Sequence, residues 1–280
     1  MSEADRLPPS FTDAAIARTG ALLYRWTGMI FGPGKRYYIE RRLIDRMANR
    51  RVRDPHSYLD LAATDPAERE ALINAFTINE TYFYREDHQL RALSNHILPD
   101  IVQGKRPGDL VRIWSMPCST GEEPYSIALW LLENWPLVDA YNIEIVGSDI
   151  DTEALAEARD GRFNARSLGR LPETMLASYF EAEENYHRRI IDDLRESVRF
   201  VSANIIDAGT LTGMGRFDVI LCRNLLIYFD DASRALAARN LSDSLNPGGY
   251  LCLGHSESMA RITADFSQVR LPDAIVYRKP

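Results

Sequence analysis

The feature that most constrains the fold of this chain is an alternation of apolar and amphipathic segments that begins near residue 107. Helices are expected over 123–135, 151–160 and 231–245. Strands are expected over 109–115, 142–150, 197–205, 216–224 and 249–258, and residues 266–280 can supply another. Strands that alternate with helices are typical of an α/β fold with a doubly wound, mostly parallel sheet. In such sheets, ligands bind beyond the carboxyl ends of the strands.

The first part of the chain has helical periodicity and no convincing strand. Residues 36–53 predict an amphipathic helix, because Ile39, Leu43 and Met47 recur at intervals of four residues. We therefore expect three regions, which are a helical N-terminal domain over 1–76, a linking segment over 77–106 and an α/β domain over 107–280.

The predicted helix 36–53 carries much of the positive charge of the chain. The whole sequence has a formal net charge of −7, yet residues 35–53 hold eight Lys or Arg and two Asp or Glu, a local charge of +6. On a helix, Arg42, Arg46 and Arg53 would fall within about 40° of one another. This basic face predicts a binding surface for an acidic partner, although a merely solvated helix face has the same composition.

The composition restricts the classes of function. Three cysteines lie far apart, and five histidines are scattered without a His-x-x-x-His or Cys-x-x-Cys pair. We therefore expect reduced thiols, a cytoplasmic protein and no metal site. No apolar run reaches about 18 residues, so no membrane span is expected. The N-terminal residues lack the basic and apolar blocks of a secretory signal.

The segment RIWSMPCSTGEEPYSIALWLL (112–132) has the strand–loop–helix layout of a nucleotide-cofactor site. Its loop has one glycine, Gly121, followed by Glu122 and Glu123, and lacks the glycine spacing and the lysine of phosphate-binding loops. Adjacent carboxylates would repel a pyrophosphate, which argues against NAD, FAD and ATP. They suit a cofactor with positive charge and no phosphate, such as S-adenosylmethionine. Alternatively, both glutamates simply occupy a helix N-terminus, where the dipole favours negative charge.

Three other features accompany this loop. Asp149 ends the second predicted strand, where an acid can accept both hydroxyls of an adenosine ribose or serve as a turn residue. NETYFYRE (79–86) places Asn, Thr and Arg among three aromatic residues, which can also form a plug between two domains. CRNLLIYF (222–229) ends the fourth predicted strand and contains Tyr228, which can equally be a core aromatic.

Six segments in this order resemble the chemotaxis-receptor glutamate methyltransferases, the CheR family. They are NETYFYRE, WSMPCSTGEEPYSIA, GSDID, SANI, CRNLLIYF and NPGGYLCLGHSES, and they span residues 79–258. The helical N-terminal part with its basic helix is also similar to that of the family. The resemblance implies a class I S-adenosylmethionine-dependent methyltransferase domain with a small inserted subdomain at about 160–196. It also implies methyl transfer to glutamate side chains of chemoreceptor cytoplasmic domains, which gives glutamate methyl esters.

The resemblance also implies site residues. The family's cofactor-binding positions correspond here to Asn79, Thr81, Arg85, Glu122, Asp149, Asn204, Ile205, Arg223 and Asn224. Of the two adjacent glutamates, we expect Glu122 rather than Glu123 to contact the cofactor. Arg85 and Tyr228 match the residues placed near the transferred methyl. The basic side chains expected to bind the receptor are Arg42, Arg46 and Arg53.

One departure from the family concerns the inserted subdomain. Members that dock on a C-terminal peptide tether of the receptor use a glycine-containing loop there. Residues 180–194 contain no glycine. We therefore expect an enzyme that does not depend on a tether.

The chemistry of this reaction fits the residues available. An acceptor glutamate has an unperturbed pKa of about 4.3, so it is ionised at neutral pH and needs no general base. Arg85 can hold the carboxylate through its planar fork. Tyr228 can donate one hydrogen bond.

Two other functions are compatible with parts of the sequence. A nucleic-acid methyltransferase would use the basic helix to contact phosphates, but the chain is acidic and lacks the N/D-P-P-Y/F signature of amino-methylating enzymes. A non-catalytic module that binds receptors or senses the cofactor is the second alternative, against which Arg85, Asp149 and Tyr228 argue. We expect a monomer that binds a chemoreceptor and neither nucleic acid nor a membrane.

Overall fold

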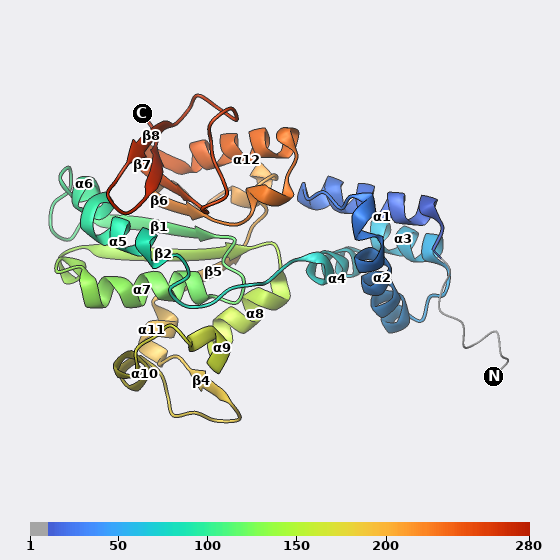
Figure 1. Ribbon diagram of the computed structural model, residues 1–280, viewed down its shortest axis with the longest axis horizontal. Helices are drawn as coiled ribbons and strands as arrows, with labels where there is room; N and C mark the ends of the chain where they lie inside the picture. Colours follow the sequence, from blue (N-terminus) through green and yellow to red (C-terminus); the bar gives the residue numbers. More distant parts are fainter. Residues whose placement is uncertain (1–10) are drawn as a thin grey trace. The chain divides into compact units, whose positions relative to one another are not determined.

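The computed structural model describes residues 11–280, which form two compact units (Figure 1). One unit comprises Met1–Ile78 together with Tyr228–Ser233, and the other comprises Asn79–Ile227 together with Arg234–Pro280. Residues 1–10, on which the expectation about a secretory signal falls, lie outside the described residues. No helix in the described part of the chain is long and apolar enough to cross a membrane.

The helical unit begins and ends its helices with clear local signals. Its elements are α1 (Asp13–Thr27), the 3₁₀ turn η2 (Pro33–Lys35), α2 (Arg36–Arg50), α3 (Pro55–Thr64) and α4 (Pro66–Phe76). Side chains of Thr12, Asp54 and Asp65 accept hydrogen bonds from the first backbone amides of α1, α3 and α4. The expected helical N-terminal region is confirmed, and its core holds fully buried side chains from all four helices, among them Leu23, Leu43, Leu59 and Leu72.

The helix predicted over 36–53 ends earlier than expected. Arg51 adopts a left-handed backbone conformation with φ of 54°, and the Val52 amide donates to the Met47 carbonyl at 3.0 Å. Val52 then packs against the core of the unit. Arg53 therefore follows the helix instead of lying on it, and the prediction that it shares one helix face with Arg42 and Arg46 is wrong.

The segment Tyr228–Ser233 belongs to the helical unit although it is distant from it in sequence. The Ile30 amide donates to the Tyr228 carbonyl at 2.9 Å, and Met29 pairs with Phe229 in an isolated antiparallel bridge. The Tyr24 hydroxyl donates to Asp230 Oδ2 at 2.9 Å. The chain therefore contributes to this unit at two separate places.

The other unit is built on a seven-stranded sheet with the order β5-β2-β1-β6-β7-β9-β8. The strands are β1 (Leu110–Met116), β2 (Asn142–Asp149), β5 (Val198–Ser202), β6 (Phe217–Cys222), β7 (Leu245–Leu253), β8 (Ser267–Arg270) and β9 (Ile275–Arg278). The first five in spatial order are parallel, and β9 pairs antiparallel with both of its neighbours, β7 and β8. The predicted mostly parallel α/β sheet is confirmed, and the C-terminal segment supplies two strands. Strand order reverses between β1 and β6, which is where such sheets bind ligands.

Helices cover both faces of this sheet. They are α5 (Asp87–Ala92), the π-helical η3 (Leu93–Ile97), α6 (Leu98–Val102), α7 (Glu122–Asn134), α8 (Thr152–Asp160) and α12 (Asp231–Ser244). Figure 1 draws α7 on one side of the sheet and α12 on the other. Short 3₁₀ turns complete the connections at η4 (Val138–Ala140), η5 (Ala208–Leu211) and η6 (Leu226–Tyr228).

A small subdomain is inserted between α8 and β5. It contains β3 (Arg162–Asn164), α9 (Ala165–Leu168), α10 (Glu173–Tyr179), β4 (His187–Arg189) and α11 (Asp192–Glu196), with β3 and β4 paired antiparallel. Its Phe163 ring lies edge-on to the ring of Phe83, with 4.8 Å between centroids. The insertion thus shares its core with the segment that precedes α5.

Candidate functional site

Several polar segments meet beyond the carboxyl ends of β1, β2, β5 and β6. The loop between β1 and α7 starts with a cis peptide bond between Met116 and Pro117, and the Cys118 amide donates to the Ser148 carbonyl at 2.8 Å. Gly121 has φ of 97°, and a Cβ added there would lie 3.0 Å from Ala158 Cβ and 3.1 Å from the Tyr125 ring. The single glycine of this loop therefore allows α7 to start against α8.

Asp149 connects this loop to the one that follows β2. Its Oδ2 accepts from the Ser119 amide at 2.8 Å, and its Oδ1 accepts from the Asp151 amide at 2.9 Å. Burial raises the pKa of Asp149 to about 6, against the lowering effect of these two backbone bonds. A carboxylate has about four acceptor positions, so these two bonds leave acceptor capacity on Asp149.

Asn79 attaches the segment 79–86 to the same two loops. Its Nδ2 donates to Asp151 Oδ2 at 2.7 Å, and its Oδ1 accepts from Ser119 Oγ at 3.1 Å. Thr81, two residues further along, is half-buried. The structure therefore brings Asn79, Asp149 and the β1–α7 loop together, as their shared sheet edge predicts.

Glu122 and Glu123 point to different partners. Glu122 accepts from Thr120 Oγ1 and Ser167 Oγ, both at 2.7 Å, and burial raises its pKa. Glu123 accepts from Ser115 Oγ at 2.8 Å and pairs with Arg223 at 2.6 Å. Glu122 thus faces the inserted subdomain, whereas Glu123 faces the end of β6. Each has specific partners beyond its place at a helix N-terminus.

Arg223 and Asn224 follow the end of β6. The guanidinium of Arg223 is turned inward, 3% exposed, and pairs with Glu86 as well as Glu123. Any contact of Arg223 with a cofactor would therefore come from its backbone. Asn224 is left-handed, with φ of 58°, and its amide donates to Glu257 Oε2 at 2.7 Å.

Glu257 is a residue whose role sequence reasoning missed. It also accepts from the amides of Leu226, at 2.6 Å, and Gly254, at 2.9 Å, so one carboxylate fixes the loops after β6 and β7. A Cβ on Gly254 would lie 2.7 Å from Glu257 Oε2. Both residues belong to the segment NPGGYLCLGHSES, whose single carboxylate is Glu257, but nothing in that segment indicates that this carboxylate binds backbone amides.

Asn204 and Ile205 form the turn after β5. The Asn204 amide donates to Thr210 Oγ1 at 2.9 Å, and its Oδ1 accepts from the Ile206 amide at 3.2 Å. Ile205 is buried, and its carbonyl accepts from Asn240 Nδ2 at 2.6 Å. This turn lies at the same sheet edge as Asp149, because β5 is parallel to β2.

Arg85 and Tyr228 fall in different units. Arg85 is half-buried, donates to the Glu80 carbonyl and lies over the Tyr82 ring at 5.8 Å. Tyr228 lies in the helical unit, where the Lys35 ammonium is 5.7 Å from its ring centre. The structure therefore does not bring these two predicted catalytic residues together within one unit.

Two of the three aromatic residues of the segment 79–86 are core residues of the α/β unit. Phe83 is fully buried, and Tyr84 lies edge-on to Trp130 with 5.4 Å between ring centroids. Both belong to the main hydrophobic core of that unit. These two rings therefore pack within the α/β unit, which differs from the alternative of a plug between two domains.

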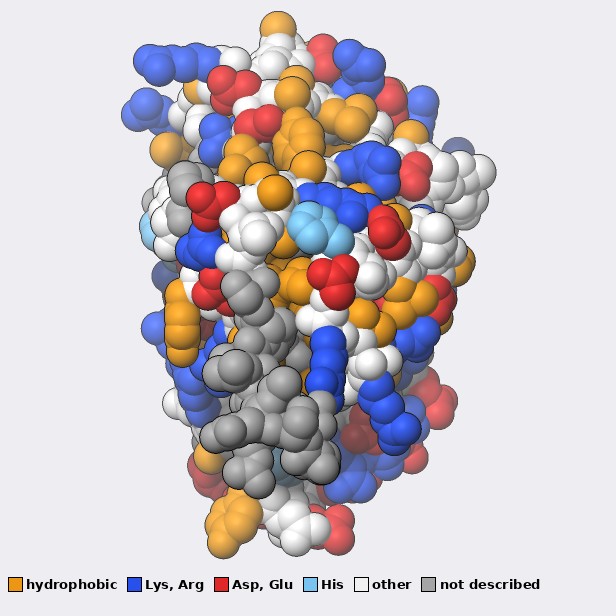
Figure 2. Space-filling model, turned by 90° about the vertical axis from the view of Figure 1, so that its right-hand side faces the viewer, with side chains coloured by type: hydrophobic (Ala, Val, Ile, Leu, Met, Phe, Trp, Pro, Cys, Tyr) orange, Lys and Arg blue, Asp and Glu red, His pale blue; other side chains and the backbone are white. Residues whose placement is uncertain are grey.

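The three predicted receptor-binding arginines differ in environment. Arg46 holds Glu68 through two bonds, at 2.8 and 3.1 Å, and Glu68 is 1% exposed and also accepts from Tyr58. Arg42 lies over the Tyr38 ring at 5.1 Å, and Arg53 is exposed. On the face drawn in Figure 2, basic side chains are interspersed with acidic ones.

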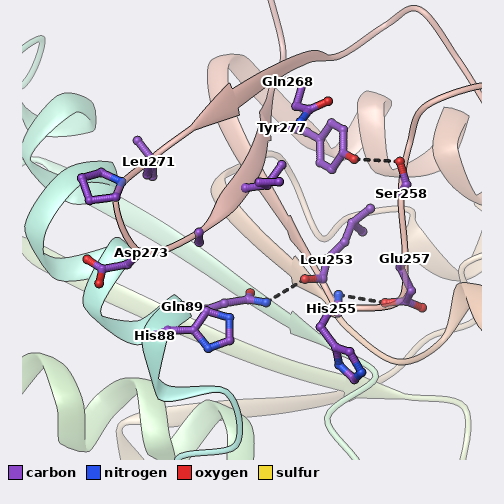
Figure 3. A pocket seen from close by; sticks show the side chains of 14 residues that line it. His88, Gln89, Leu253, His255, Glu257, Ser258, Gln268, Leu271, Asp273 and Tyr277 are labelled. Atoms are coloured by element: carbon purple, nitrogen blue, oxygen red, sulfur yellow. Dashed lines mark hydrogen bonds between the residues drawn. The ribbon is translucent and has the colours of Figure 1, made fainter.

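A polar cavity of about 480 Å³ opens beside the end of β7 (Figure 3). Gln89 lines it and donates to the Leu253 carbonyl at 2.7 Å, and the Tyr277 and Ser258 hydroxyls are 3.0 Å apart. Within the described residues, no group of three or more His, Cys, Asp or Glu is arranged to hold a metal ion.

Comparisons with known proteins identify both units. Residues 79–275 match the family described as "CheR methyltransferase, SAM binding domain", and residues 14–77 match "CheR methyltransferase, all-alpha domain". The chain is 47% identical over 272 residues to chemotaxis protein methyltransferase 2 of Vibrio cholerae, covering 96% of this chain and 94% of that protein. It is 36% identical to the chemotaxis protein methyltransferase of Klebsiella aerogenes, with 94% and 89% covered. It is 34% identical to that of Vibrio parahaemolyticus, with 90% and 91% covered.

Proposed function

The chain belongs to the CheR methyltransferase family, and from this premise we propose that it methylates glutamate side chains of chemoreceptor cytoplasmic domains. The methyl donor is S-adenosylmethionine, and the product is a glutamate methyl ester. The observation that carries the proposal is the meeting of Asn79, Asp149 and the carboxylate-bearing β1–α7 loop at the switch point of the sheet. The relatives are named chemotaxis protein methyltransferases, which supports a chemosensory substrate.

The described residues at this edge fit a cationic cofactor without phosphate. Asp149 keeps acceptor capacity for ribose hydroxyls, and residues 112–124, from β1 to the start of α7, contain two adjacent carboxylates and no lysine. When bound, S-adenosylmethionine supplies a methyl group activated by its sulfonium. We assign its binding to Asn79, Thr81, Arg85, Glu122, Asp149, Asn204, Ile205, Arg223 and Asn224, with Arg223 acting through its backbone.

The acceptor carboxylate needs orientation instead of deprotonation. It is already ionised at neutral pH, so the site has to align it with the methyl group and exclude water. We assign Arg85 to holding the carboxylate and Tyr228 to donating a hydrogen bond at the reacting groups. Arg85 positions the acceptor without binding it so tightly that its nucleophilicity is lost.

Receptor binding is assigned to the basic segment of the helical unit. Arg42 and Arg53 offer positive charge to a glutamate-rich receptor helix. Arg46 adds to the field of this segment, but its guanidinium already holds Glu68. The electrostatic attraction should weaken with salt, because exposed charges are screened over about 8–10 Å at ordinary ionic strength.

Independence from a receptor tether is part of the proposal. The chain turns just before β4, between the paired residues Glu184 and His187, and Asn185 and Tyr186 in this turn are both left-handed. Tether-binding relatives have a glycine-containing loop in this subdomain. Tyr186 is 86% exposed at this turn. We expect equal methylation of receptors with and without their C-terminal peptide.

The proposal is tested with radiolabelled S-adenosylmethionine and a panel of receptor cytoplasmic domains from the host. Base-labile label on a receptor, unchanged when its C-terminal tether is removed, is expected. Label that resists base, or label transferred only to RNA or DNA, would contradict glutamate methylation. Receptor binding without any transfer would indicate a non-catalytic module.

A further inference from the structure

A cluster of buried charges surrounds Arg223 and has a consequence for Arg85. Arg223 Nη1 lies 2.6 Å from Glu123 Oε2, and Nη2 lies 3.2 Å from Glu86 Oε2. Nη2 also donates to the backbone carbonyl of Arg85 at 2.7 Å. The Arg223 guanidinium therefore contacts the carboxylates of Glu86 and Glu123. It also contacts the backbone of Arg85, the residue assigned to hold the acceptor carboxylate.

The two carboxylates connect this guanidinium to the rest of the sheet edge. Glu123 stands in the first turn of α7 and accepts from Ser115 on β1. Glu86 accepts a hydrogen bond from Gln89 Nε2. Its Oε1 also lies 2.9 Å from Nδ1 of His255, a residue in the loop after β7. The cluster thus joins the segment that contains Arg85 to β1, to the start of α7 and to the loops after β6 and β7.

The backbone on both sides of Arg85 requires such support. Tyr84 and Glu86 have φ of 57° and 55°, a conformation that residues other than glycine adopt only where their surroundings impose it. The Tyr84 amide donates to Ser126 Oγ at 3.0 Å. Tyr84, Arg85 and Glu86 are therefore each fixed by a separate bond to a neighbouring element.

Stability does not account for this arrangement. Burying a guanidinium and two carboxylates has a desolvation cost that their attraction barely repays, so such clusters contribute little net stability. Within the described residues, Arg223 Nε is buried and lacks a hydrogen-bond partner. We therefore attribute the cluster to fixing the positions of the residues around Arg85.

We propose that Arg223 is a positioning residue, which fixes the backbone at Arg85 and thereby the direction of the Arg85 guanidinium. This inference rests on the proposed function and assigns the Arg223 side chain a role other than cofactor contact. Glu86 and Glu123 hold Arg223 in place. Lysine cannot replace it, because a single ammonium lacks the planar fork that reaches both carboxylates and a carbonyl.

A double-mutant cycle tests the coupling. Arg223→Lys is expected to lower kcat/KM about tenfold, as small displacements of catalytic groups do. In an Arg85→Lys background the same change should cost less than about twofold, because coupled residues have non-additive effects. Equal losses in both backgrounds would overturn the proposal, since a direct cofactor contact or a general loss of structure acts independently of Arg85.

Arg112 supplies a matched control. It pairs with Glu144 and donates to the Arg216 carbonyl at 2.8 Å, so it makes the same kinds of contact at the opposite end of the sheet. Arg112→Lys should leave kcat/KM within about twofold, as expected for a site remote from the chemistry.

Hydrogen exchange gives a readout that needs no turnover. Amides over residues 80–90 should exchange faster in Arg223→Lys and at the wild-type rate in Arg112→Lys. Unchanged exchange in Arg223→Lys would overturn the positioning role. Failure of the wild type to methylate any receptor would instead contradict the proposed function, and the exchange result would still decide the role of Arg223.

Discussion

Each unit of the chain pairs an arginine with a buried or half-buried carboxylate, but the two arrangements differ in what they hold. In the helical unit, Arg46 joins α2 to Glu68 of α4, and Tyr58 of α3 completes the cluster. In the α/β unit, Arg223 joins carboxylates to the main chain of Arg85. The first cluster ties helices to one another, whereas the second ends at a functional segment. The same residue types therefore connect helices in one unit and fix a functional segment in the other.

The largest effect is expected in the helical unit. Arg46→Ala leaves Glu68 buried beside Tyr58, and the remaining positive neighbour that the described residues provide is Arg50, 3.4 Å away. Breaking a buried pair in this way should lower the free energy of unfolding by about 3 kcal/mol. The control is Arg41→Ala, on the exposed face of the same helix. Denaturant unfolding of both variants measures the change in the free energy of unfolding. If Arg46→Ala had an unchanged unfolding midpoint, the Arg46–Glu68 pair would not stabilise the helical unit.

In the α/β unit, substitution of Arg85 should affect the rate of methyl transfer more than stability or receptor binding. Arg85→Ala is expected to lower methyl transfer about a hundredfold, because the acceptor loses its orienting group. Receptor binding and the unfolding midpoint should stay near the wild-type values. Arg166→Ala is the control, since that side chain is 88% exposed in the same unit. A loss of stability as large as that of Arg46→Ala would erase the contrast between the units.

The pH dependence of cofactor binding tests the buried acid of the α/β unit. The pKa of Asp149 is raised to about 6, so its contribution to folding stability is full below the unfolded value and is lost as pH rises through about 6. Ribose hydroxyls donate to the ionised form. The Kd for S-adenosylmethionine should therefore rise about tenfold between pH 7 and 5. Calorimetry on Asp149→Asn should find this dependence absent, and an equally steep profile in that variant would assign it to another group.

The smallest effect concerns the surface of the helical unit. Arg53→Glu should lower receptor methylation about threefold at low salt and less at high salt, because exposed charges contribute little and are screened. Cofactor affinity should not change. Arg25→Glu, an exposed arginine of α1 outside the basic segment, is the charge-matched control. Identical rates for both variants would leave the helical unit with no electrostatic role in receptor binding.

The sequence predicts the sheet because strand burial depends on local patterns. β1, β2, β5 and β6 lie where apolar segments predict them, and the shared edge of parallel strands predicts that Asp149 approaches the β1–α7 loop. It could not predict that Arg51 ends α2, because a left-handed arginine has no signature in composition. Nor could it separate Arg46 from Arg42, since their difference depends on Glu68, 22 residues away in the sequence.

The adjacent glutamates illustrate the same limit. Composition and periodicity do not distinguish Glu122 from Glu123, and the helix start predicts that both are tolerated. Their partners, Ser167 and Arg223, lie 45 and 100 residues away and come from different elements. Only tertiary packing assigns one to the inserted subdomain and the other to the end of β6.

The bridge between Met29 and Phe229 affects the order in which the protein can be completed on the ribosome. The first 78 residues leave the ribosome about 10–30 s before Tyr228–Ser233, at ordinary rates of synthesis. The helical unit can therefore be completed only after Tyr228–Ser233, 150 residues further along the chain, has been synthesised. A fragment that ends at residue 78 lacks the strand partner of Met29 and the acceptor of the Ile30 amide. The helical unit therefore takes residues from both sides of the α/β segment Asn79–Ile227, and the gene cannot be divided after residue 78 without leaving this unit incomplete.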